Sequence, residues 1–188
     1  MKKLLVLLFS LFFLFSHSVF ADDISDFDIE GISIGDSLLD YMTEDEILKG
    51  IEETKNDYLW LKEPYKYAEV FIRRVFPTYK DGLAVLVKNN ASNKYIVNTN
   101  EKFSILSIRG MIHYIEDLDG CLKKKDEVAG VLSRVFSNAD ISNYDMNHAA
   151  DPSGNSKAYI TDIFLNSGEL VKIYCADFEE TFRLKNNY

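Results

Sequence analysis

The stretch Cys121–Phe136, CLKKKDEVAGVLSRVF, carries the clearest helical period in the chain and decides the predicted fold. Its apolar side chains recur at helical spacing, at Val128, Val131, Leu132, Val135 and Phe136. This spacing draws one apolar stripe along a helix of about four turns, and charged side chains occupy the opposite face. A helix with a single apolar stripe must bury that stripe against another element of the fold.

The segments on both sides of this helix have the composition of strands. Phe103–Ile115 precedes the helix and Ala158–Phe178 follows it, and the second segment is rich in Ile, Val, Tyr and Phe. The second segment contains Asn166-Ser167-Gly168, which predicts a hairpin turn between Ala158–Leu165 and Leu170–Phe178. We therefore expect an α+β fold, in which one antiparallel sheet, a meander plus this C-terminal hairpin, is covered by the one main helix.

The region before the meander is expected to form a short helical segment. Thr43 and Glu46 have the spacing of a capping box, which predicts a helix from Glu44 to Lys55. The meander is then predicted from four β-rich segments, Tyr65–Phe76, Leu83–Val87, Tyr95–Val97 and Phe103–Ile115. In the last of these the apolar positions change parity near Ser107, which predicts a bulge or a bend. Ser137–Asp151 is polar and is assigned neither strand nor helix, and Asp151–Asn155 is interpreted as a turn-rich loop.

Residues 1–21, MKKLLVLLFSLFFLFSHSVFA, have the three-part plan of a secretory signal peptide. Lys2 and Lys3 precede an apolar run, and Val19 and Ala21 stand where a signal peptidase reads. The apolar run of about a dozen residues is shorter than the roughly 18 that a membrane-spanning helix needs. The pattern predicts cleavage after Ala21, a periplasmic or secreted protein, and no membrane span.

The mature chain is expected to begin with an acidic lead-in, residues 22–30, followed by a single α+β domain over residues 31–188. The net charge of the full chain is −9, and loss of the two lysines of the signal peptide makes it more negative. Nucleic acid and anionic membrane surfaces would repel such a chain, so neither is an expected partner. The acidity is interpreted as a contribution to solubility.

Cys121 and Cys175 are the only cysteines, and in an exported chain they predict a disulfide, with two buried free thiols as the alternative. The chain-entropy model gives such a bond a stabilisation of about 4 kcal/mol. No Cys-x-x-Cys spacing occurs, and His113 and His148 are the only histidines after the signal peptide. The sequence therefore predicts no metal site, and it contains no phosphate-binding glycine loop or other sign of a cofactor.

Two short motifs resemble the GDSL (SGNH) family of esterases and lipases. IGDSL at residues 34–38 is similar to the block that holds the serine nucleophile, and DMNH at residues 145–148 is similar to its Asp-x-x-His block. The resemblance implies that Ser37, Asp145 and His148 form a catalytic triad that hydrolyses esters.

Other features of the sequence favour a structural interpretation of these motifs. The family completes its oxyanion hole with a Gly-x-Asn block, and no glycine between Ser37 and Asp145 is followed two places later by Asn. The family also has a parallel sheet, whereas this chain predicts hairpins. In the structural interpretation Gly35 ends a strand, and Asp36 or Ser37 caps a helical turn. The esterase is kept as the alternative hypothesis.

The stretches IEGISIGDSLLDYMTEDEI and GCLKKKDEVAGVLSRVF, with the signal peptide and the late cysteine in IYCADF, resemble small secreted proteins of Pelagibacter-like marine alphaproteobacteria. This resemblance implies export and a single α+β domain, and it carries no activity or cofactor. The favoured hypothesis is an exported binding or interaction module without catalytic chemistry, whose ligand is an unidentified protein or small molecule. It follows from the lack of a complete nucleophile set, metal-ligand cluster or phosphate-binding loop.

Overall fold

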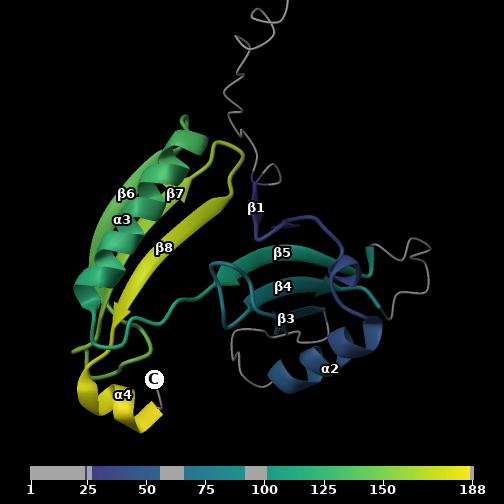
Figure 1. The fold of residues 1–188 in the computed structure, drawn as a ribbon, viewed down its shortest axis with the longest axis horizontal. Coiled ribbons are helices and arrows are strands. Elements are labelled where there is room, and N and C mark those ends of the chain that lie inside the picture. The colour runs from purple at the N-terminus through teal and green to yellow at the C-terminus, as the bar shows by residue number, and fades with distance from the viewer. Residues whose placement is uncertain (1–23, 25–26, 56–65, 92–100, 187–188) are drawn as a thin grey trace, which may run out of the picture.

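The computed structural model describes residues 24, 27–55, 66–91 and 101–186, and in this part the chain is an α+β protein with three antiparallel sheets (Figure 1). The sheets are β1–β2 (Asp28–Ile29, Ile32–Ser33), β3–β4–β5 (Tyr67–Ile72, Leu83–Asn89, Phe103–Gly110) and β6–β7–β8 (Asp140–Asn147, Lys157–Phe164, Leu170–Asp177). The helices are the 3₁₀ helix η2 (Leu38–Asp40) and the α-helices α2 (Glu44–Thr54), α3 (Leu118–Val135) and α4 (Glu180–Asn186). The predicted signal peptide, the strand Tyr95–Val97 and residues 22, 23, 25 and 26 of the lead-in lie outside the described residues.

The α+β class is confirmed, but the prediction of one sheet covered by one helix is wrong. The C-terminal hairpin β7–β8 pairs with β6, and no strand of this sheet pairs with β5. β6 lies within Ser137–Asp151, a polar segment for which the sequence predicted neither strand nor helix. Because the C-terminal hairpin finds its third strand there, it builds a second sheet instead of extending the meander.

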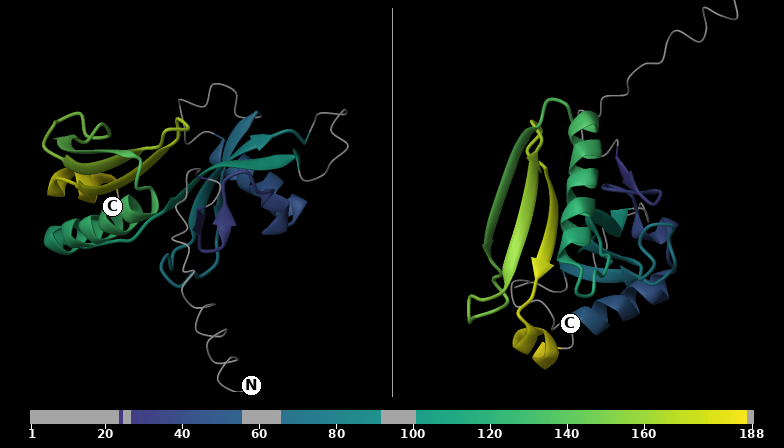
Figure 2. Two further views of the ribbon diagram at one scale, coloured as in Figure 1. Left: turned by 90° about the horizontal axis from the view of Figure 1, so that it is seen from above. Right: turned by 60° about the vertical axis from the view of Figure 1, so that its left-hand side comes forward.

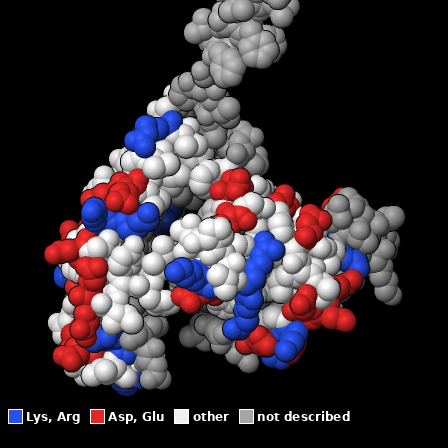
Figure 3. Space-filling model, in the orientation of Figure 1, with Lys and Arg blue, Asp and Glu red and all other residues white. Residues whose placement is uncertain are grey.

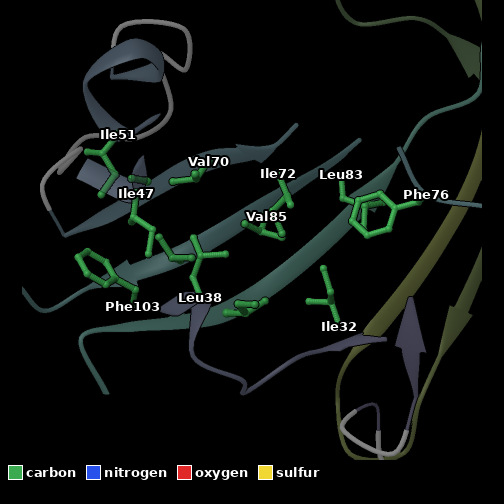
Figure 4. Packing of buried hydrophobic residues seen from close by; sticks show 13 residues of the cluster. Ile32, Leu38, Ile47, Ile51, Val70, Ile72, Phe76, Leu83, Val85 and Phe103 are labelled. Atoms are coloured by element: carbon green, nitrogen blue, oxygen red, sulfur yellow. The ribbon is translucent and has the colours of Figure 1, made fainter. Parts of the chain in front are cut away.

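The meander β3–β4–β5 is covered by α2, and the two bury a common apolar core (Figure 4). Ile47 and Ile51 of α2 point toward Val70 and Val85, and all four side chains are buried. The helix comes so close to β3 that a Cβ added to Gly50 would lie 2.8 Å from Val70 Cγ1. The predicted capping box is present, with Thr43 Oγ1 accepting from the Glu46 N–H and Glu46 Oε2 accepting from the Thr43 N–H.

The predicted bulge in β5 is also confirmed. Leu86 is opposite Ser107 and Val87 is opposite Ile105, so Leu106 is the extra residue. β5 ends at Gly110, short of the predicted end at Ile115. A Cβ at Gly110 would collide with the ring of Tyr79, which explains why glycine stands where the strand ends.

The fold has two layers. The first is α2 with β3–β4–β5, and the second is β6–β7–β8 with α3, which packs on β7 and β8. α3 begins at Leu118, three residues before the predicted start, because Asp117 caps it by accepting a hydrogen bond from the Gly120 N–H. The predicted disulfide joins Cys121 of α3 to Cys175 of β8, with the two Cα atoms 6.0 Å apart. The helix therefore covers the C-terminal hairpin, and the meander has its own helix.

The apolar stripe predicted for α3 is only partly buried. Leu132 and Phe136 lie in a second core with Ile163 of β7. Val131, which the periodicity placed in the stripe, is half exposed. The buried face of α3 is therefore narrower than its apolar periodicity predicts.

The N-terminal hairpin β1–β2 joins the two cores. Ile32 is buried in the first core, whereas Phe27 and Ile34 pack against the second. The ring of Phe27 meets that of Phe136 edge to face, with centroids 5.8 Å apart. Figure 2 (right) shows α3 between the β6–β7–β8 sheet and this hairpin, so one face of that sheet points away from the rest of the molecule.

Candidate binding surface

The residues of the hypothetical triad lie on separate elements of the fold. Ser37 is 4% exposed and caps η2, where its Oγ accepts a hydrogen bond from the Leu39 N–H at 3.3 Å. This cap agrees with the structural interpretation of the IGDSL motif. Ser37 also forms an isolated antiparallel bridge to Ser104 of β5.

Asp145 and His148 lie in the second layer, formed by α3 and β6–β7–β8. Asp145 is an exposed residue of β6. His148 follows β6, and its Nδ1 accepts a hydrogen bond from the Ala150 N–H at 3.2 Å. Burial lowers the pKa of His148, against the opposing charge of Asp151, and its ring lies edge to face on Phe178. No hydrogen bond of the described residues joins two members of the triad, and the esterase stays a prediction.

Asp151 organises the loop that follows β6, a role that the sequence analysis missed. Its carboxylate accepts hydrogen bonds from both the backbone N–H and the hydroxyl of Ser153 and of Ser156. These bonds, those of the Ser156 hydroxyl first, lower the pKa of Asp151 to about 2. Ser156 Oγ also accepts from the Glu179 N–H, so the loop holds the start of α4 in place. The turn-rich sequence DPSGN at residues 151–155 was the available signal.

The β6–β7–β8 sheet has one face covered by α3. Lys125 of α3 donates to Thr161 Oγ1 at 2.9 Å, and that hydroxyl donates to Asn143 Oδ1 at 2.6 Å. Together with the disulfide at Cys175, these contacts assign the odd-numbered residues of all three strands to the α3 side. Side chains alternate along a strand, so the even-numbered residues form the other face.

This other face, which we call the open face, carries large exposed apolar side chains. They are Tyr144 and Met146 of β6, Phe164 of β7, and Leu170 and Tyr174 of β8. Between 40% and 47% of each of these residues is exposed. Tyr144, Ile160 and Tyr174 are opposite one another in register, and so are Phe164 and Leu170, which makes the apolar residues neighbours across the three strands.

A polar group of three residues lies at the centre of the open face. Asp162 is 4% exposed and accepts a hydrogen bond from Tyr144 Oη at 2.8 Å. Lys172 Nζ lies 3.1 Å from the Asp162 Oδ1. Partial burial lowers the pKa of Lys172, but its hydrogen bonds with Asp162 and Tyr144 outweigh burial and raise that pKa overall. The negative charge of the buried Asp162 is therefore balanced by Lys172 on the same face.

The strand β6 is unusual because all eight of its residues are exposed, which holds for no other strand in the described ranges. It forms an edge of its sheet and pairs with β7 without a register shift. Its sequence, DISNYDMN, contains no Lys, Arg or Pro. The carboxylates of Asp140 and Asp145 make no hydrogen bond or ion pair with any described residue. Acidic side chains also line much of the outer margin of the molecule beside α3 and β6 (Figure 3).

The edges of the meander differ from β6 in being engaged by other parts of the chain. At the β5 edge, Ile105 O accepts from the Gly35 N–H at 2.8 Å, and the Ile105 N–H donates to Asp36 O at 2.9 Å. At the β3 edge, the Thr54 hydroxyl donates to the backbone carbonyl of Glu69. No described strand pairs with the outer edge of β6. Because an unpaired strand edge is a template for another strand, this free edge and the adjoining open face form the candidate binding surface.

No family model, curated protein or solved structure matches this chain. Within the part of the chain that the structure describes, no helix is long and apolar enough to cross a membrane. The same part contains no group of three or more His, Cys, Asp or Glu residues placed to hold a metal ion. The candidate surface is therefore judged on its own chemistry.

Proposed function

We propose that this protein is an exported interaction module that binds another polypeptide through the open face of the β6–β7–β8 sheet, without catalytic chemistry. The observation that carries this proposal is the group of half-exposed aromatic, Leu and Met side chains on that face. Contiguous exposed apolar patches on soluble proteins mark interaction sites. Tyr, Phe and Met are also enriched where proteins contact one another, which favours a polypeptide over a small molecule.

The polar centre of the open face suits a surface that a partner covers. Asp162 is already buried and paired with Lys172, so covering it adds little desolvation cost. The Tyr144 hydroxyl and the Lys172 ammonium remain at the surface, and their fixed positions restrict which polar groups a partner can place against them. The arrangement thus combines apolar contact area with a source of specificity.

Two features support export. Residues 1–21 have the pattern of a signal peptide, and the bond between Cys121 and Cys175 is of the kind that persists in oxidising compartments. A periplasmic or secreted location brings the open face into contact with other exported proteins. The net charge of −9 argues against nucleic acid as the partner.

Site-specific photo-crosslinking tests the proposal. A photoreactive phenylalanine analogue replaces Tyr144 or Tyr174 on the open face, and in a control protein it replaces Val75, which is exposed in the other layer. Each protein is irradiated in the exported protein fraction of the cells that make it. We expect a discrete cross-linked product from the two open-face positions and none from position 75.

A second variant makes the test specific to the apolar side chains. Phe164→Ser with Leu170→Ser, added to the protein labelled at position 174, is expected to reduce the yield of the cross-linked product. Equal products at positions 75 and 174, or no product at either open-face position, would contradict the proposal.

A further inference from the structure

The free edge of β6 indicates how a partner is held, and this inference rests on the function proposed above. We propose that the bound segment of the partner is an extended strand carrying Lys or Arg, which pairs with β6 and lengthens the sheet. The evidence is the geometry of the edge, its charge and its apolar residues.

The geometry of β6 suits the addition of a strand. In an antiparallel pair only alternate residues of an edge strand bond to their neighbour, so half of the backbone N–H and C=O groups of β6 point away from β7. The eight residues pair with β7 in one unbroken register from Asp140 to Asn147, which leaves a regular edge without a bulge. An added strand gains its affinity from bonds to such backbone groups.

β6 also lacks three of the features that protect strand edges from pairing, and its two charged side chains are both acidic. Lysine, proline and bulges commonly protect such edges, and β6 has none of them. β5 has both a bulge and the backbone bonds from Gly35 and Asp36. The contrast within one molecule indicates that the β6 edge is kept available.

The charge of the edge identifies the chemistry of the incoming strand. Asp140 lies on the open-face side of β6 and Asp145 on the α3 side, so an added strand meets an unpaired carboxylate on each of its faces. Opposite charges facing each other across neighbouring strands stabilise the pairing. The net charge of −9 also draws a cationic segment to the protein before contact.

The apolar residues of β6 indicate which residues the partner's strand carries at its other positions. Ile141 on the α3 side, and Tyr144 and Met146 on the open face, are each more than a third exposed. Aliphatic or β-branched residues opposite them would bury this surface. The predicted segment therefore has cationic residues opposite the two aspartates and apolar residues between them.

A second copy of the chain fits this edge less well. The full chain has a net charge of −9, and loss of Lys2 and Lys3 makes each exported copy more negative, so two copies repel each other on approach. β6 also has no cation to place against the aspartates of its neighbour. Self-association through β6 is consequently an outcome that would contradict the inference.

The test uses a fluorescent synthetic peptide of the same length as β6. It carries Lys opposite Asp140 and Asp145 in the antiparallel register, and Val or Thr at its other positions. One control peptide has Glu in place of Lys, and another has N-methyl groups on the residues whose N–H would bond to β6. We expect saturable binding of the lysine peptide by fluorescence polarisation, and at least tenfold weaker binding of both controls.

Two variants of the full mature protein complete the design. Asp140→Asn with Asp145→Asn removes only the charges of β6, and we expect it to bind the lysine peptide about tenfold more weakly. The matched control, Asp45→Asn with Asp177→Asn, removes two exposed aspartates elsewhere and should bind as the wild type does. Thermal unfolding verifies that both variants are folded.

Three results would overturn the inference. They are equal binding of the N-methylated peptide, equal binding by the Asp140/Asp145 variant, and a β6-dependent dimer of the free protein in sedimentation. If no peptide binds while the photoreactive residue at position 174 still cross-links to a partner, strand addition is wrong and the proposed function stands. If the cross-links fail as well, the proposed function is also wrong.

Discussion

The two layers of this protein use their strands differently. In the layer of α2 and β3–β4–β5, Val85, Phe103 and Ile105 are fully buried, and backbone or side-chain groups engage both outer strands. In the layer of α3 and β6–β7–β8, one face is open, one edge strand is exposed along its whole length, and a disulfide holds the helix. The first layer thus buries most of its apolar surface, and the second leaves a face and an edge exposed, which is the surface we propose for recognition.

Truncation of one phenylalanine in each layer should give the largest contrast. Phe103→Ala empties a buried site in the meander and is expected to lower the free energy of unfolding by about 3 to 5 kcal/mol. Phe164→Ala removes a half-exposed ring from the open face and should cost about 1 kcal/mol or less. Urea unfolding measures both, and similar costs at the two positions would break the comparison.

Removal of the disulfide should have the next largest effect, confined to the second layer. Cys121→Ser with Cys175→Ser is expected to lower the free energy of unfolding by about 2 to 4 kcal/mol. Amide hydrogen exchange should accelerate in α3 and β8 and remain slow in β3–β4–β5. Reductant serves as the control, because it should destabilise the wild type and leave the variant unchanged. Faster exchange throughout the meander would show that the layers are not separable in this way.

Ser37→Ala tests whether the first layer contains a catalytic serine. Loss of the η2 cap is expected to cost about 1 kcal/mol, whereas Ser167→Ala in the exposed β7–β8 turn should cost almost nothing. We expect no labelling of the wild type by a fluorophosphonate probe. Labelling that disappears in Ser37→Ala and persists in Ser167→Ala would support the esterase and contradict a purely structural role for Ser37.

The sequence-based predictions succeeded where the signal is local. The capping box at Thr43, the turn Asn166–Gly168 and the parity change near Ser107 each act within a few residues, and all three are confirmed. The disulfide was predictable because only two cysteines were available to pair. The interpretation of Ser37 as a cap is also confirmed, because capping depends only on residues next to Ser37 in the sequence.

The candidate surface could not be predicted because it depends on β6. The sequence DISNYDMN has polar residues at both odd and even positions, so it lacks the alternation that identifies a strand. Its extended conformation comes from pairing with β7, a contact between distant residues that propensity does not report. Because no strand was predicted at β6, the C-terminal hairpin had no third strand, and a single sheet was the consequence.

The pH dependence of stability should show the smallest effect, in the loop next to β6. The pKa of Asp151 is about 2 in the folded protein, below the ordinary value of about 3.9 for an unfolded chain. Its contribution to stability is therefore complete above about pH 4 and is lost as the pH falls toward 2. Thermal unfolding between these values should depend less steeply on pH in Asp151→Asn than in the wild type. Identical profiles would show that the hydrogen bonds of Asp151 do not favour its ionised form.

Titration of isotope-labelled protein with the lysine peptide, followed by amide chemical shifts, tests the division between the layers most directly. We predict saturating shifts in β6 and in the adjoining residues of β7, with the resonances of α2 and β3–β4–β5 unchanged. Shifts centred on the meander, or spread evenly over both layers, would contradict this division.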